Sequence, residues 1–173
     1  GNNTTYPGLM EANQKCIING IRYSFNASGA MQTGWIKSAE GWYYANTNGA
    51  ITEGWQKING KWYYLNPEKA GVMSTGWIQL GNNWYWLDNS GAMKTGWNNG
   101  YCLGSDGAMR TGWILEPEGW YYADGSGALA NGWRYVNGAW YYLDGSNTEH
   151  PYLMLNNTKK TIAGCDYYFA NGG

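Results

Sequence analysis

A Gly-Trp pair recurs at nearly regular intervals along this 173-residue chain. The spacings between successive Trp residues of the pair are 20, 22, 20, 16 and 20, so one repeat is about twenty residues long. Self-similarity at such a period is typical of arrays in which each repeat packs mainly against its neighbours. The recurring Trp residues are Trp35, Trp55, Trp77, Trp97, Trp113 and Trp133.

A second aromatic cluster follows the first Trp by seven residues in five of these repeats, as in Trp42-Tyr43-Tyr44. Between the aromatic runs stand turn sequences such as Asn19-Gly20, Asn59-Gly60 and Asn137-Gly138, and Asn-Gly favours the type I′ turn of a two-residue β-hairpin. The second connection, as in Asp88-Asn89-Ser90-Gly91, also has turn chemistry. Because a lone hairpin is marginal in water, the sequence predicts an all-β repeat solenoid of stacked β-hairpins.

Two flanking segments, residues 19–25 and 164–169, carry the same pattern without its Trp residues. They bring the expected number of hairpins to about eight, with the first and last copies divergent, as is usual for the ends of a stack. The repeat module is expected to span residues 15–173. Residues 1–14 begin with Gly1 and a polar stretch, which resembles a tag scar followed by a leader segment.

Composition excludes several classes of function. Eleven basic and twelve acidic residues nearly cancel, which argues against nucleic acid as a partner, and no run of 18 apolar residues is present to span a membrane. The three cysteines, Cys16, Cys102 and Cys165, define neither a disulfide framework nor a zinc site. Pairing of Cys102 between chains in a homodimer is left open.

The sequence offers little for catalysis. The one histidine, His150, stands in a polar connection before Pro151, and Glu116 and Glu118 flank Pro117 in a hairpin loop. No nucleophile, phosphate loop or metal constellation accompanies them, so no catalytic residue, cofactor or metal is predicted. The possibility that a longer protein carries a catalytic domain elsewhere stays open.

Strand alternation sorts the side chains by face, because successive residues point in opposite directions. Trp35, Trp42 and Tyr44 share one face, while Ile36 and Tyr43 share the other, which we assign to the interior. The Trp, Trp, Tyr set then recurs where one hairpin meets the next. Such rings either pack the hairpins against one another or form an aromatic cage that attracts a quaternary ammonium ion by cation–π interactions.

The unit from Thr33-Gly34-Trp35 to Gly49-Ala50 and its copies resemble the choline-binding (cell-wall-binding) repeats of Gram-positive bacterial and phage surface proteins. The resemblance covers about residues 15–169. It implies a secreted, cell-surface protein with a left-handed β-solenoid of about three hairpins per turn. It also implies non-catalytic attachment to the phosphocholine of teichoic acids. In such a protein each choline site takes two aromatic side chains from one hairpin, a third from the next and sometimes a Met.

Carried over position by position, the resemblance implies four choline sites. They are Trp35, Trp42 and Tyr64; Trp55, Trp62 and Trp86, with Met73; Trp113, Trp120 and Tyr142; and Trp133, Trp140 and Tyr168. In the middle of the chain the pattern fails. The residue that should complete the site of Trp77 and Trp84 is Cys102, which has no ring, and Gly100 stands where the Trp partner of Trp97 should be. At the start, Lys15 and Arg22 occupy both Trp positions.

A carbohydrate partner is the alternative. Similar repeats occur in the glucan-binding domains of streptococcal glucosyltransferases and in clostridial toxins, and Asp166-Tyr167-Tyr168-Phe169 looks more like these. Aromatic platforms stack on sugar rings, but a sugar site also needs polar groups that bond hydroxyls. The paired Trp positions favour a cage for choline over a single platform for a glycan.

Overall fold

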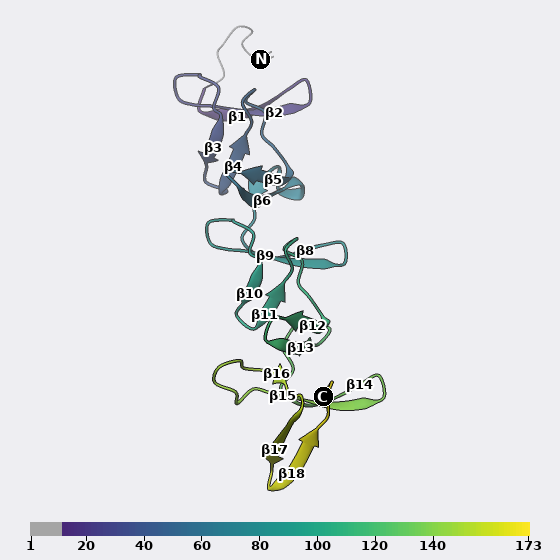
Figure 1. Cartoon of the computed structure of the whole chain (residues 1–173). Helices are drawn as coiled ribbons and strands as arrows, with labels where there is room; N and C mark the ends of the chain where they lie inside the picture. Colours follow the sequence, from purple (N-terminus) through teal and green to yellow (C-terminus); the bar gives the residue numbers. More distant parts are fainter. Residues whose placement is uncertain (1–11) are drawn as a thin grey trace. The chain divides into compact units, whose positions relative to one another are not determined.

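The computed structural model describes residues 12–173 and consists almost entirely of short antiparallel strands (Figure 1). The all-β hairpin repeat predicted from the sequence is therefore confirmed. Most of the segment interpreted as a tag scar and leader lies outside the described residues. The elements are β1 (Gln14–Ile18), β2 (Ile21–Phe25), β3 (Gly34–Lys37), β4 (Trp42–Ala45), β5 (Gly54–Ile58), β6 (Lys61–Asn66), η1 (Pro67–Lys69), β7 (Val72–Met73), β8 (Gly76–Leu80), β9 (Asn83–Leu87), β10 (Gly96–Asn98), β11 (Tyr101–Leu103), β12 (Gly112–Glu116), β13 (Gly119–Ala123), β14 (Gly132–Val136), β15 (Ala139–Asp144), β16 (Leu153–Met154), β17 (Thr158–Ile162) and β18 (Cys165–Phe169).

Within residues 12–173 these strands form eight separate sheets, one for each expected hairpin. Six sheets have two strands, and in the other two a short third strand is added, β7 beside β6 and β16 beside β15. No helix in this part of the chain is long and apolar enough to cross a membrane.

The hairpin turns have the predicted geometry. Asn59 and Gly60 have φ values of 49° and 81°, and Asn137 and Gly138 have 50° and 90°, so both central residues are left-handed, as a type I′ turn requires. The shortened hairpin β10–β11 turns in the same way, because Asn99 has φ 48°. It keeps the antiparallel register in spite of its missing residues.

The connections between hairpins also have the predicted turn chemistry, and most begin with an Asp or Asn whose side-chain oxygen accepts backbone N–H hydrogen bonds. The side chain of Asp124 accepts hydrogen bonds from the backbone N–H of Ser126 at 2.8 Å and of Ala128 at 3.3 Å. Gly127 follows with φ +81°, and a Cβ atom there would lie only 2.3 Å from Sδ of Met109 in the preceding connection. The recurring Gly and Met are thus a stacking pair that joins successive connections.

Contacts between Cα atoms divide the chain into two compact units, which we call the first and second units. The first comprises the described residues up to Leu80 together with Trp86–Met93, and the second comprises Gly81–Tyr85 and Lys94–Gly173. Each unit contains hairpins whose inner faces supply its core.

The inner faces carry the side chains that alternation assigned to them. In the first unit Ile36 and Tyr43 are buried with Ala45 and Ile51. In the second unit the core clusters contain Cys102, Ile114, Tyr121 and Ala123, and then Ala130, Leu143 and Met154. Tyr43 and Tyr121 are the aromatic members of these buried clusters, and partly buried rings such as Trp113 and Tyr141 pack against the third cluster.

One ionised group is buried in the second unit. Asp144 accepts hydrogen bonds from Lys160 Nζ and from Ser146 Oγ, the latter at 2.6 Å. Burial by itself would raise the pKa of Asp144, but the hydrogen bonds from Lys160 and Ser146 outweigh it and hold the pKa below its ordinary value. This pair anchors the long connection between β15 and β17.

Candidate aromatic binding sites

Each candidate site begins with two Trp side chains on one hairpin. Trp113 lies opposite Tyr122 in the strand register and Trp120 lies opposite Leu115, so both indoles project from the same face. Their ring centroids are 6.2 Å apart and their planes meet at 85°. The pairs Trp55–Trp62 and Trp133–Trp140 repeat this geometry, with centroids 6.4 and 6.5 Å apart and planes at 87° and 86°.

A tyrosine of the following hairpin supplies a third wall. The Tyr141 ring lies 4.7 Å from the Trp113 ring, edge to face, at 75°. The same contact joins Trp35 to Tyr63 at 4.9 Å in the first unit and Trp133 to Tyr167 at 4.9 Å in the second. Tyr63 and Tyr141 are the middle residues of their Trp-Tyr-Tyr triplets, and Tyr167 takes the same strand position in the last hairpin, where Asp166 replaces the Trp.

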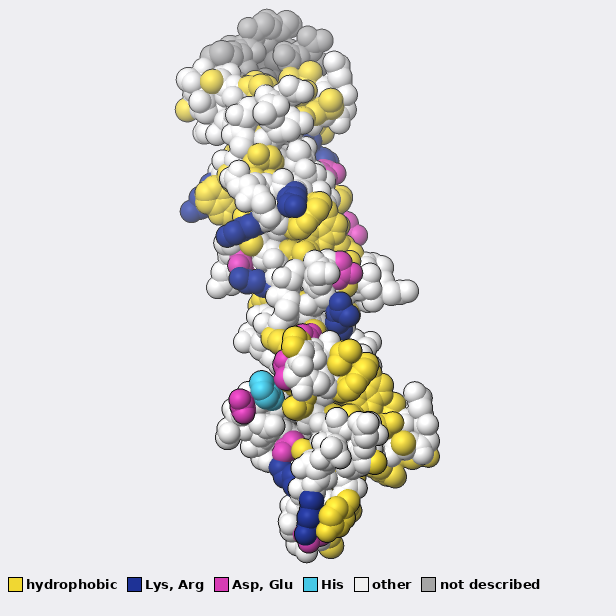
Figure 2. Space-filling model, viewed as in Figure 1, with side chains coloured by type: hydrophobic (Ala, Val, Ile, Leu, Met, Phe, Trp, Pro, Cys, Tyr) yellow, Lys and Arg dark blue, Asp and Glu magenta, His cyan; other side chains and the backbone are white. Residues whose placement is uncertain are grey.

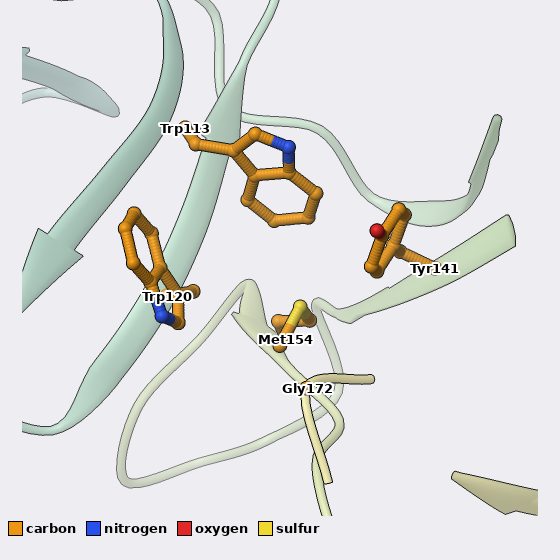
Figure 3. Close-up of a pocket in the computed structure, with 5 residues that line it drawn as sticks. All are labelled: Trp113, Trp120, Tyr141, Met154 and Gly172. Carbon is orange, nitrogen blue, oxygen red and sulfur yellow. The ribbon is translucent and has the colours of Figure 1, made fainter. Parts of the chain in front are cut away.

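The three rings enclose a space and do not fill it. Around Trp113, Trp120 and Tyr141, the pocket has a volume of about 230 Å³, with Met154 and Gly172 completing its lining (Figure 3). Figure 3 shows the three rings facing a common gap, with the Met154 side chain between Trp120 and Tyr141. We call this the Trp113 pocket.

Two further pockets have the same plan. The Trp35 pocket, of about 340 Å³, is lined by Trp35, Trp42, Tyr63, Met73, Asn89 and Ser90. The Trp133 pocket, of about 420 Å³, is lined by Trp133, Trp140 and Tyr167 and is the most open of the three. Each lies within one unit of the chain.

The structure places other tyrosines at the third wall than those expected from the sequence. Tyr64 and Tyr142 do not line these pockets, because each stands directly opposite the first Trp of its own hairpin and packs against it, at 5.3 Å from Trp55 and 5.2 Å from Trp133. Trp86 packs in the same way on Trp77 at 5.3 Å.

Tyr168 and Met73 also lie elsewhere than the sequence predicts. Tyr168 lies opposite Lys159 and is 78% exposed, and its neighbour Tyr167 takes the position in the Trp133 pocket. Met73 lines the Trp35 pocket, whereas the sequence predicts it beside Trp55 and Trp62. Trp35 and Trp42, Trp113 and Trp120, and Trp133 and Trp140 line the three pockets.

The pocket walls are neutral and partly open to solvent. Among the described residues that line the three pockets, none carries a charge. Trp42 and Trp120 are each 41% exposed, and hydrophobic side chains accordingly reach the surface of both units in Figure 2. The negative faces of aromatic rings therefore provide the main electrostatic feature of the Trp113 pocket, which favours a cation without hydrogen-bond donors. Beside the Trp35 pocket, Lys37 Nζ lies 5.8 Å from the Trp42 ring.

The middle of the chain keeps only part of this plan. Trp97 still contacts the tyrosine of the next hairpin, Tyr121, at 5.0 Å, but Gly100 stands where the second Trp belongs. Cys102 lies opposite Trp97 and is buried, and this burial, with the nearby Glu116 carboxylate, raises the pKa of its thiol. A bridge from Cys102 to a second chain is therefore not supported by its position in the core.

The two loop carboxylates considered for catalysis have structural partners. The Cys102 thiol lies 3.8 Å from Glu116 Oε1, and the Tyr121 hydroxyl donates to Glu118 Oε1 at 2.9 Å. Burial, together with the bond to Glu118, raises the pKa of Tyr121 to about 12. His150 stands in the connection after β15, as expected, and is 40% exposed.

Paired indoles closed by a tyrosine, and in two of the three pockets also by a methionine, recur along the hairpins and define a binding module with aromatic cages. The family described as "Choline-binding repeat" matches residues 52–97, and the family described as "Putative cell wall binding repeat" matches residues 33–51, 111–129 and 131–146. The chain belongs to this choline-binding, cell-wall-binding repeat family.

Solved structures of choline-binding proteins are similar to this chain. Choline binding protein F from Streptococcus pneumoniae is 36% identical and matches with a TM-score of 0.79 over 92% of this chain and 56% of that one. CbpJ from Streptococcus pneumoniae TIGR4 is 37% identical, with the same TM-score and coverage. The choline-binding domain of CbpL from Streptococcus pneumoniae is 25% identical, with a TM-score of 0.67 over 94% of this chain and 96% of that one.

This chain thus spans 56% of the length of the first two relatives. Among curated protein sequences, none matches it. Membership of a cell-wall-binding repeat family indicates association with a cell surface.

Proposed function

We propose that this chain is a non-catalytic attachment module of a secreted protein and that its aromatic pockets bind the choline of phosphocholine-decorated teichoic acid. The observation that carries the proposal is the Trp113 pocket, in which two perpendicular indoles, Tyr141 and Met154 surround an unfilled space. A trimethylammonium group can contact a ring face on three sides there.

The neutral lining favours a quaternary cation. A primary ammonium ion would lose hydrogen bonds to water on entering a pocket without a carboxylate, whereas a quaternary ammonium ion has no N–H group to satisfy. A sugar ring would need polar side chains beside the stacking surface, and the Trp113 pocket offers few.

The strength of one site follows from its walls. A cation–π contact is worth about 0.5 to 2 kcal/mol, so three rings supply roughly 2 to 6 kcal/mol, which corresponds to weak binding near the millimolar range. Several such sites on one chain can engage a repetitive polymer, and avidity then raises the effective affinity by about 10² to 10⁴. The repetition of the fold thereby serves attachment to a wall.

Calorimetry with choline chloride tests the proposal, and heat from at least three sites is expected. The protein should also be retained on a tertiary-amine resin and be eluted by free choline. No heat up to tens of millimolar choline, or retention on dextran in place of the amine resin, would refute choline binding and favour the glycan alternative.

A further inference from the structure

The first hairpin carries a lysine where the later hairpins carry their first Trp. Lys15 lies opposite Ser24 in the β1–β2 register, as Trp35 lies opposite Tyr44 in β3–β4. Arg22 correspondingly occupies the position of the second Trp. This end of the stack therefore lacks both indoles of a choline cage.

The Lys15 ammonium group nevertheless lies over an aromatic ring of the next hairpin. Its Nζ atom is 4.0 Å from the ring centroid of Tyr43, the tyrosine that corresponds to Tyr63 of the Trp35 pocket. The same Nζ donates to the Tyr43 hydroxyl at 2.8 Å and to Glu40 Oε2 at 3.0 Å. The cation is thus held by one aromatic face and two hydrogen-bond acceptors.

The charges around this group support that arrangement. Partial burial alone would lower the pKa of Lys15, but hydrogen bonds to Tyr43 and Glu40 raise it above its ordinary value. The Ser38 hydroxyl and Lys15 together lower the pKa of Glu40 to about 2. Both members of the ion pair are therefore charged over the physiological pH range.

We propose that the space above Tyr43 is a site for a primary ammonium ion, which the chain fills with its own Lys15. Glu40 and the Tyr43 hydroxyl accept N–H hydrogen bonds, which a quaternary ammonium ion cannot donate. Arg22 is engaged in an ion pair with Glu53 and adds no aromatic wall. The first inter-hairpin position is consequently closed to choline and joins β1–β2 to β3–β4 without a ligand.

A small ammonium ion from solution can reach this site once the lysine side chain is removed. An open pocket of about 180 Å³ adjoins Lys15 and Tyr43. Ser24 and Gln32 also line it, and their side chains are hydrogen-bonded to each other at 2.8 Å. A Lys15→Ala variant would enlarge the pocket by the volume of the lost side chain.

Chemical rescue of Lys15→Ala tests the assignment. The variant should melt roughly 2–4 °C below the wild type, and methylammonium chloride at about 100 mM should restore part of that loss beyond its effect on the wild type. Tetramethylammonium and sodium chloride at equal ionic strength should restore none of it. Lys57→Ala is the control, because Lys57 Nζ lies 5.9 Å from the Trp62 ring and should give no methylammonium rescue.

Rescue by tetramethylammonium as strong as by methylammonium, or equal behaviour of the two variants, would overturn the proposal. If Lys15→Ala fails to fold, NMR of the wild type decides instead. The ε-methylene protons of Lys15 should be shifted upfield by the Tyr43 ring and should lose that shift in Tyr43→Leu. An unshifted signal in the wild type would overturn the assignment.

The closure to choline rests on the proposed function and has its own test. The double variant Lys15→Trp, Arg22→Trp should bind one more choline than the wild type. An unchanged number of sites in a variant with the wild-type melting temperature would contradict the closure. A wild type that binds no choline would refute the proposed function and leave the methylammonium result standing.

Discussion

Replacing Tyr141 with Leu should weaken choline binding in the Trp113 pocket, whereas the same change at the adjacent Tyr142 should not. The two tyrosines are neighbours in sequence but point to opposite faces of β15. Tyr141 contacts Trp113 at 4.7 Å and lines the pocket, while Tyr142 packs on Trp133 at 5.2 Å. The comparison therefore tests which tyrosine forms the third wall.

The expected loss follows from the three-ring geometry. Tyr141→Leu removes one aromatic wall of three and leaves Trp113, Trp120 and Met154 in place. One cation–π contact is worth about 0.5 to 2 kcal/mol, so the dissociation constant of this pocket should rise about 2- to 30-fold.

A choline titration followed by NMR resolves the pockets individually. The indole N–H signals of Trp113 and Trp120 report the affected pocket, and the signal of Trp35 reports an unaltered one in the same sample. Equal weakening by the Tyr142 variant, or an unchanged dissociation constant in the Tyr141 variant, would show that the third wall has been assigned to the wrong residue.

Three further results are expected. Gly127→Ala should reduce the free energy of unfolding by roughly 1–3 kcal/mol and lower the melting temperature, because a Cβ would meet the Met109 sulfur and φ is +81°. Met109→Ala in the same chain should recover part of the loss. A wild-type melting temperature for Gly127→Ala would contradict the stacking pair. Asp144 has a folded-state pKa below its ordinary value of 3.8, so its contribution to stability is present above that pH and is lost as the pH falls through the folded pKa. Asp144→Asn should therefore flatten the dependence of the urea-unfolding free energy on pH in this acidic window. An unchanged pH dependence would argue against the Asp144–Lys160 pair. A thiol reagent should label Cys165, which is exposed, in the native protein and Cys102, which is 2% exposed, only after unfolding; fast native labelling of both would contradict the core assignment.

The hairpins themselves could be predicted from the sequence because their signals are local. Asn59 and Gly60 select a type I′ turn by their own backbone preferences, and alternation then fixes which side chains share a face. The first two walls of each pocket follow, since both Trp residues belong to one hairpin. The Trp35–Trp42 and Trp113–Trp120 pairs were predicted on this basis.

The third wall could not be predicted in the same way. Alternation separates Tyr63 from Tyr64 but does not say which face of their hairpin meets the preceding one. That choice depends on the rotation between successive hairpins, a long-range property that no single repeat encodes. The strand register explains the outcome, because Tyr64 is already engaged with Trp55 across the hairpin and Tyr63 is left to face Trp35.

The first hairpin illustrates a similar limit. The sequence shows that Lys15 and Arg22 replace both Trp residues, and the loss of a cage follows directly. It does not show that the Lys15 ammonium group reaches Tyr43 and Glu40, which are 28 and 25 residues away. The missing cage is also an occupied cation site, and this is visible only once the hairpins are placed together.

The rings serve packing and binding in different proportions, and two substitutions separate these roles. Trp113 contacts Tyr122 at 5.1 Å and Tyr141 at 4.7 Å and packs against the core cluster of Ala130, Leu143 and Met154, whereas Trp120 is 41% exposed and forms the outer wall. Trp113→Ala should therefore cost roughly 3 kcal/mol or more of stability as well as the pocket, because it opens a cavity between hairpins.

Trp120→Ala should cost about 1 kcal/mol or less of stability while it removes one of the three walls that hold the cation. Thermal melting and the choline titration, measured on both variants, give the two quantities independently. If Trp120→Ala unfolds the second unit as readily as Trp113→Ala, the outer indoles act mainly as glue between hairpins, and the exposed face of Trp120 is not kept free for a ligand.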